Sequence, residues 1–232
     1  NQKNRSRQEW LRYFFLNANS LCHPSVLIRK QCYIDCGAYR HGFGQLADFD
    51  MWVRLALKYE IHIIPEKLIK FRLRDNEANS SANNLENQSR MFYEFSLILD
   101  NYSKIDCINE LIRVFPEASK FCNGDSPDIR YALAMSIIEL KPFNFSIQYA
   151  LKILFDLLND PSHKLKFKSN DFIKLTGELD PLEIKLREQL NHNVTKLTIK
   201  IDNLHQTATE KDGLLQSLSN TLAEKEAVIS GL

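Results

Sequence analysis

The sequence predicts an α/β domain that is followed by an α-helical bundle and a long coiled-coil-like helix. Three observations support this fold class. Residues 1–80 mix short strand-like and helical runs, whereas residues 81–180 carry apolar side chains at helical spacing. Residues 181–232 have no aromatic side chains and carry a heptad pattern. We therefore expect three regions with boundaries near residues 80 and 180.

The composition, the net charge and the length of the apolar runs restrict the classes of protein to which this chain can belong. The chain has 232 residues, of which 44% are hydrophobic and 25% charged, as is usual for a globular protein. Its net charge of +1 gives no general attraction to nucleic acid, so no nucleic-acid partner is expected. No apolar run reaches the ~20 residues that a transmembrane helix needs. The chain begins with Asn1 rather than methionine, and its last repeat is incomplete, so we expect a fragment of a longer protein.

The first region alternates helical and extended signals. The runs "EWLRYFFLNANS" and "DFDMWVRLALKY" have helical spacing, and a third helix is expected to end at Gly37. Residues 26–28, 61–64 and 68–73 read as strands, the last two being separated by Pro65. Five cysteines without disulfide or zinc spacing are interpreted as small apolar residues in a reducing compartment.

The other two regions are expected to be helical. In residues 81–180, apolar side chains repeat every three or four positions, which is typical of a helical bundle. From residue 182 onward, apolar residues alternate at spacings of three and four, with two lysines and Gly213 as flaws. This pattern predicts a coiled coil, and hence self-association through residues 182–232. A single amphipathic helix packed on its own bundle is the alternative.

Six polar or aromatic side chains of the first region are candidates for a functional site. Each also has a local structural interpretation. Asp48 and Asp50 lie at the start of a predicted helix, where the positive end of the helix dipole stabilises carboxylates. His23 can be a hydrogen-bonded structural residue and Trp52 a core residue. Arg72 and Arg74 lie two residues apart, so they can be a solvated face of one strand.

Taken together, these residues predict a reaction. A carboxylate fixed at a helix start can remove a proton from an attacking hydroxyl. Two arginines on one strand face can bind a diphosphate and stabilise its charge as it leaves. Trp52 offers a flat surface for a sugar ring. A base, an aromatic surface and a cationic clamp are what transfer from a nucleotide sugar requires.

The motifs also resemble those of a known family. The chain shows "NSLCHPSVLIRK", "CGAYRHGFGQLADFDMWVRL" and "IIPEKLIKFRLRDNEANSS" in that order. Over about seventy residues, from Trp10 to Ser81, this order resembles the C-terminal half of a family 2 glycosyltransferase domain of the GT-A fold. Three positions depart from the family pattern: Ala47 replaces a glutamate, Arg40 an aspartate and Arg74 a histidine.

The resemblance implies roles for the six residues. Asp48 would be the catalytic base, Arg72 and Arg74 would contact the donor diphosphate, and the acceptor side would hold His23, Trp52 and Asp50. It implies a nucleotide-sugar donor and a glycan or lipid-linked acceptor. It also implies Mg²⁺ or Mn²⁺, bound by an Asp-x-Asp motif expected upstream of this sequence, so that the fragment alone would be inactive.

The resemblance further implies bacterial lipopolysaccharide or capsule synthesis in the cytoplasm, with peripheral attachment at the inner membrane. A second hypothesis belongs to another class of protein. The chain would then be a non-catalytic helical assembly module that retains a remnant of the glycosyltransferase segment. A nucleotide-binding half encoded upstream would favour the enzyme over the module.

Overall fold

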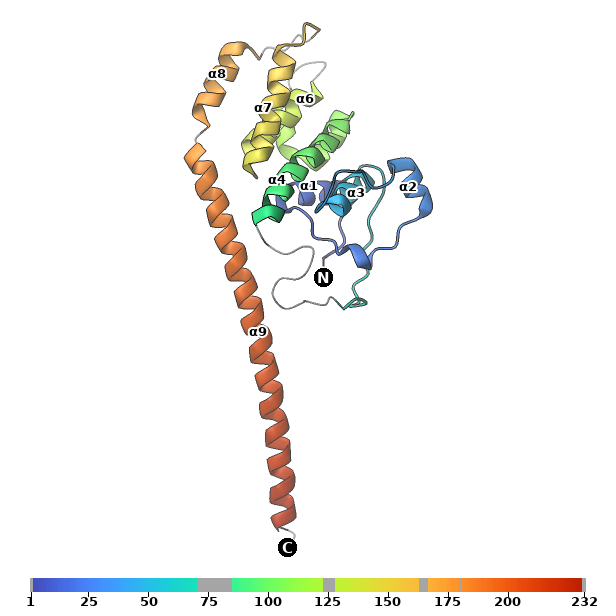
Figure 1. Cartoon of the computed structure of the whole chain (residues 1–232), viewed down its shortest axis with the longest axis vertical. Coiled ribbons are helices and arrows are strands. Elements are labelled where there is room, and N and C mark those ends of the chain that lie inside the picture. Colours follow the sequence, from blue (N-terminus) through green and yellow to red (C-terminus); the bar gives the residue numbers. More distant parts are fainter. Residues whose placement is uncertain (1, 71–84, 123–127, 163–166, 180, 231–232) are drawn as a thin grey trace. The chain divides into compact units, whose positions relative to one another are not determined.

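The computed structural model describes residues 2–70, 85–122, 128–162, 167–179 and 181–230 (Figure 1). Within these residues it contains helices and no strand. The α/β fold class predicted for residues 1–80 is therefore wrong for the part of the chain that is described. Two compact units are present, Asn1–Leu179 and Asp180–Leu232.

The first unit contains eight α-helices and shorter 3₁₀ turns among its described residues. The α-helices are α1 (Arg7–Asn17), α2 (Lys30–Cys36), α3 (Ala47–Ala56), α4 (Leu85–Leu99), α5 (Ile108–Val114), α6 (Ile129–Leu140), α7 (Asn144–Leu158) and α8 (Ser169–Glu178). The 3₁₀ turns are η1 (His23–Ser25), η3 (Asp100–Lys104) and η4 (Pro116–Phe121). The expected helix end at Gly37 is confirmed, since Gly37 follows α2 with φ 80°.

The runs expected to be strands lack a neighbouring strand among the described residues. Residues 26–28 and 61–64 form no ladder, and the run 68–73 lies partly outside the described residues. A strand is stable only when an adjacent backbone satisfies its N–H and C=O groups. At Ile63 the side chain of Asn4 satisfies both backbone groups in place of a neighbouring strand. Asn4 Oδ1 accepts a hydrogen bond from the Ile63 N–H at 2.6 Å, and Asn4 Nδ2 donates one to the Ile63 carbonyl at 3.1 Å.

One apolar core joins segments from both sides of residue 80. Every residue of 49–56 in α3 is buried, so this helix is enclosed on all faces. Phe49 contacts Phe14 of α1 at 5.6 Å between ring centroids and Phe95 of α4 at 5.3 Å. Tyr102 of η3 donates a 2.8 Å hydrogen bond to the Leu11 carbonyl. The regions 1–80 and 81–180 therefore belong to the same compact unit.

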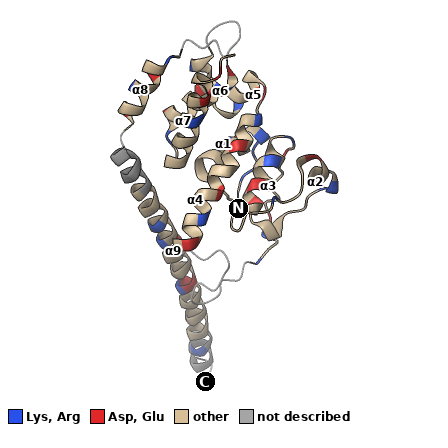
Figure 2. Cartoon of the chain, turned by 45° about the horizontal axis from the view of Figure 1, so that its top comes forward, with Lys and Arg blue, Asp and Glu red and all other residues tan. Residues whose placement is uncertain are grey.

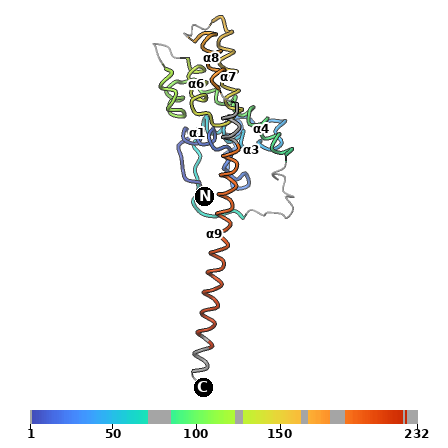
Figure 3. The backbone as a smooth tube through the Cα atoms, turned by 90° about the vertical axis from the view of Figure 1, so that its left-hand side faces the viewer, coloured from blue at the N-terminus to red at the C-terminus, as the bar shows by residue number. Residues whose placement is uncertain are grey.

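The helical character expected for residues 81–180 is confirmed in the described ranges. Helices α6 and α7 lie side by side in the first unit (Figures 1 and 3). Leu133, Ile137 and Leu154 are buried in the core that they share. Asp128 begins α6, because its carboxylate accepts a hydrogen bond from the Tyr131 N–H at 2.9 Å.

Glu94 of α4 holds the loop that leads into α3. Its side chain is 1% exposed, and its carboxylate accepts hydrogen bonds from the backbone N–H groups of Gly44 at 2.6 Å, Gln45 at 2.9 Å and Leu46 at 2.6 Å. These donors precede the first turn of α3, where a negative charge is favoured. Glu94 thus fixes the position at which the buried helix starts.

Replacement of Glu94 by alanine is expected to lower the free energy of unfolding by about 2–4 kcal/mol, since three backbone N–H groups lose their acceptor and that of Leu46 is buried. Urea unfolding followed by circular dichroism measures the loss. Glu86→Ala is the matched control, because Glu86 lies on the same helix with a side chain 79% exposed and its ion pair with Arg90 contributes about 0.5 kcal/mol. Equal losses in the two variants would contradict this role of Glu94.

The second unit is a single helix in its described part, α9 (Pro181–Ser230), of 50 residues. The long C-terminal helix expected from the sequence is therefore confirmed. None of the described helices combines the length and the apolar character needed to cross a membrane. In the view of Figure 2, acidic and basic residues are interspersed along the described helices of the first unit. All five cysteines are free.

Candidate functional site

Asp48 lies in the first turn of α3 and is partly exposed. Its Oδ2 accepts a hydrogen bond from Asn19 Nδ2 at 3.1 Å, and its Oδ1 accepts from the Phe49 N–H at 2.7 Å. Within the described residues no lysine, arginine or histidine forms an ion pair with it. The carboxylate is thus held by two neutral donors and remains accessible, which leaves it able to accept a proton.

His23 and Tyr39 form a hydrogen-bonded pair. The Tyr39 hydroxyl lies 3.0 Å from His23 Nε2, and the two rings meet edge to face at 5.7 Å between centroids. Burial raises the pKa of Tyr39 to about 12, together with its hydrogen bond to Tyr33 and the negative charge of Asp48. Asp48 lies four residues before Trp52 and hence on the same face of α3, and the ring of Trp52 lies against that of His23, so Asp48 and the His23–Tyr39 pair lie in one neighbourhood.

Trp52 joins this neighbourhood from the core side. Its ring centroid lies 6.0 Å from that of His23, with the ring planes tilted by 53°. The residue is only 2% exposed, and its buried Nε1 has no hydrogen-bond partner in the described structure. In this structure the indole fills the core with the rest of the enclosed helix α3, whereas the expected sugar-binding role needs an open face. Trp52 instead packs against the ring of His23.

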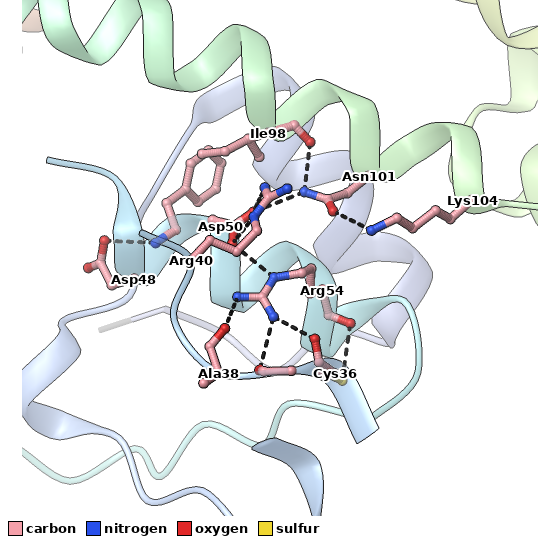
Figure 4. A network of polar contacts seen from close by, with 11 residues as sticks. Cys36, Ala38, Arg40, Asp48, Asp50, Arg54, Ile98, Asn101 and Lys104 are labelled. Carbon is pink, nitrogen blue, oxygen red and sulfur yellow. Dashed lines mark hydrogen bonds and ion pairs between the residues drawn. The ribbon is translucent and has the colours of Figure 1, made fainter. Parts of the chain in front are cut away.

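Asp50 has a different environment from Asp48, although both are in the first turn of α3. It is fully buried and pairs with two arginines (Figure 4). Arg40 donates from Nε at 3.0 Å and forms an ion pair through Nη2, while Arg54 donates from Nε at 2.8 Å. Asn101 Nδ2, from a third residue, adds another donor at 3.1 Å. In this structure the Asp50 carboxylate is saturated with donors and closed to solvent, whereas the acceptor-side role expected from the sequence needs an accessible carboxylate.

Arg54 carries this network to the loop after α2. Its guanidinium donates to the carbonyls of Cys36 at 2.6 Å, Gly37 at 3.0 Å and Ala38 at 3.0 Å (Figure 4). A residue four positions after Asp50 falls on the same face of a helix, so Arg54 necessarily lies beside it. The network positions the loop that bears Tyr39. Asp50 therefore influences the candidate site only by helping to hold this loop in place.

The remaining expectations concern the donor. Arg72 and Arg74 lie outside the described residues. No group of three or more His, Cys, Asp or Glu side chains able to bind a metal ion occurs in the described part of the chain. The residues around Asp48 therefore do not fit Mg²⁺ or Mn²⁺, which need several oxygen ligands. Nothing in the sequence singled out Tyr39, which is one of two aromatic residues, with Phe43, in the loop "GAYRHGFG".

The comparisons leave the site to be interpreted from its own chemistry. No family model, no characterised protein and no solved structure matched this chain.

Proposed function

We propose that this chain provides the catalytic base and part of the acceptor side of an inverting glycosyltransferase. The supporting observation is the position of Asp48: a partly exposed carboxylate without an ion-pair partner among the described residues, one helical turn before Trp52, whose ring lies against His23. The proposal rests on these residues and on the order of the sequence motifs. It does not depend on an α/β fold.

In the proposed reaction, Asp48 takes the proton of an acceptor hydroxyl as the hydroxyl oxygen attacks the anomeric carbon of the donor sugar. The bond from that carbon to the diphosphate oxygen breaks, and the nucleoside diphosphate leaves with the electron pair. Attack from the face opposite to the leaving group inverts the anomeric carbon. The exposed His23 and its partner Tyr39 supply the polar groups that would orient the acceptor hydroxyl.

The donor side is proposed on the sequence alone. Arg72 and Arg74 would neutralise the departing diphosphate. A divalent cation, when bound, would supply further charge neutralisation at the diphosphate, from ligands other than the described ones. The motif order favours a polysaccharide acceptor, with assembly on the cytoplasmic side of a bacterial inner membrane.

Release of nucleoside diphosphate tests the reaction class. The longest natural protein that contains this sequence would be incubated with Mn²⁺, a lipid extract of its source cells, and UDP-glucose, UDP-galactose, UDP-N-acetylglucosamine, GDP-mannose or dTDP-rhamnose in turn. We expect one donor to release its diphosphate at a rate well above that of heat-inactivated protein. Background rates with all five donors, together with no donor binding in calorimetry, would reject the proposed function.

A further inference from the structure

Helix α9 carries a row of apolar side chains that face solvent. Its side chains are described over residues 189–223 and at Lys225, and all of these residues are exposed. Eight large apolar side chains on one face are 51–65% exposed: Leu190, Val194, Leu197, Ile201, Leu204, Leu215, Leu218 and Leu222. A helix with such a face gains stability only when another surface covers it.

The spacing of this row identifies the kind of surface that fits it. With Ala208 and Lys211 included, the ten positions alternate at spacings of four and three from Leu190 to Leu222. A repeat of seven residues in two turns is slightly shorter than the natural period of an α-helix. Two such helices keep the row at their contact only by winding around each other in a left-handed supercoil. The partner is therefore another helix with a heptad repeat.

We propose that a second copy of this chain covers the row, and that the two α9 helices form a parallel, in-register, two-stranded coiled coil. In heptad notation Val194 and Ile201 occupy a positions, while Leu190, Leu197 and Leu204 occupy d positions. β-Branched residues at a combined with leucine at d favour two parallel strands. The first half of the row therefore has the residue pattern that is typical of a two-stranded, parallel coiled coil.

The area available on each helix is sufficient for a stable dimer. At about 25 cal/mol per Å², the 1.5–3 kcal/mol gained on burying an aliphatic side chain corresponds to about 60–120 Å². Eight such side chains offer roughly 500–1,000 Å² on each copy, against about 800 Å² per partner in a standard protein interface.

The residues that flank the row allow two identical copies to approach. In a parallel pair, Lys200 at g faces His205 at e of the other copy, and Thr207 faces Asp212. No two carboxylates and no two lysines oppose each other at these flanking positions in residues 189–223. Because the flanks hold mostly uncharged residues, they provide no charge pattern that would select a different partner.

Lys211 at a d position limits the number of strands. Two copies bring two Lys211 side chains together, and in a two-stranded coil each can extend its ammonium group to water while its methylenes pack. A third strand would enclose these charges. Lys211 thus weakens the dimer but disfavours a larger bundle.

Sedimentation equilibrium of the whole 232-residue chain tests the proposal, with Ile201→Lys compared with Ile199→Lys. Both are exposed isoleucines of α9, at 51% and 55%, but Ile199 lies at f, opposite the row. We expect a wild-type mass of twice 27.0 kDa. The dimer dissociation constant should rise at least about 100-fold in Ile201→Lys and change less than about threefold in Ile199→Lys. Lys211→Leu should lower it.

Three results would overturn the proposal: a wild-type monomer at about 100 μM, a trimeric mass, or equal effects of the two isoleucine substitutions. Direction is tested by oxidation of a chain in which the exposed Cys22 and Cys107 are replaced by serine, since α9 itself contains no cysteine. In that background Val194→Cys should form a disulfide-linked dimer that neither the parent chain nor Ile199→Cys forms, because identical a positions meet only in a parallel, in-register pair. Failure of Val194→Cys to crosslink while the protein remains dimeric would contradict the parallel arrangement. None of these results depends on the proposed transferase activity.

Discussion

Replacement of Asp48 by asparagine is expected to lower the turnover of the proposed sugar transfer by about 10²–10⁴-fold, the usual contribution of a general base. The reason is chemical, because an amide cannot accept the proton of the acceptor hydroxyl. The change is nearly isosteric, and one side-chain oxygen remains to accept the Phe49 N–H. Turnover would be measured as nucleoside diphosphate release with the donor that the panel identifies.

The matched variant is Asn19→Ala, which removes the side chain that donates to Asp48 Oδ2 but keeps the carboxylate. We expect a much smaller loss of turnover, since Asn19 only orients the base. Near-normal turnover in Asp48→Asn would remove Asp48 as the base, whether or not the reaction class is correct. A substantial loss in Asn19→Ala with none in Asp48→Asn would point to the asparagine instead.

Replacement of Asp50 by alanine is expected to lower the free energy of unfolding by about 3–5 kcal/mol. Removing the carboxylate leaves the buried guanidinium of Arg54 without its counter-charge and Asn101 Nδ2 without one acceptor. Arg54 keeps three loop carbonyls, which limits the loss to this range. Urea unfolding measures it, with the exposed acid Asp156, paired with Lys152, as the control whose removal should cost about 0.5 kcal/mol.

A double-mutant cycle separates the ion pair from the packing around it. Arg54→Met alone should also destabilise, because Asp50 and the loop carbonyls lose donors. The double variant Asp50→Ala/Arg54→Met should cost less than the sum of the two single changes, since no uncompensated charge stays buried. Simple additivity would show that Asp50 and Arg54 do not stabilise the fold as a pair.

Most helices could be predicted from the sequence, because apolar periodicity and end signals are local properties. Helix α2 ends at Gly37, as the glycine indicated. The strands could not be predicted correctly in this way. Residues 61–64 have strand composition, but strand formation depends on a neighbouring backbone, and here Asn4 binds Ile63 in its place.

The candidate site, like the fold, could be predicted only in part from the sequence. The sequence pattern indicated His23, Asp48 and Trp52, and the structure places His23 beside Trp52, which lies one helical turn after Asp48. The burial of Asp50 could not be read from its spacing, because it depends on Asn101, 51 residues away. Glu94 was missed for the same reason, as its three donors lie 48–50 residues earlier in the chain.

The division of roles between Asp48 and Asp50 is tested most directly by urea unfolding of Asp48→Asn and Asp50→Asn in the 232-residue chain. We expect Asp48→Asn to stay within about 0.5–1 kcal/mol of the wild-type free energy, since its carboxylate has two neutral donors and partial exposure. Asp50→Asn should lose at least about 2 kcal/mol more, because an amide cannot balance two arginines in the core. A loss in Asp48→Asn as large as that in Asp50→Asn would make both aspartates structural and contradict the assignment of Asp48 as a free base.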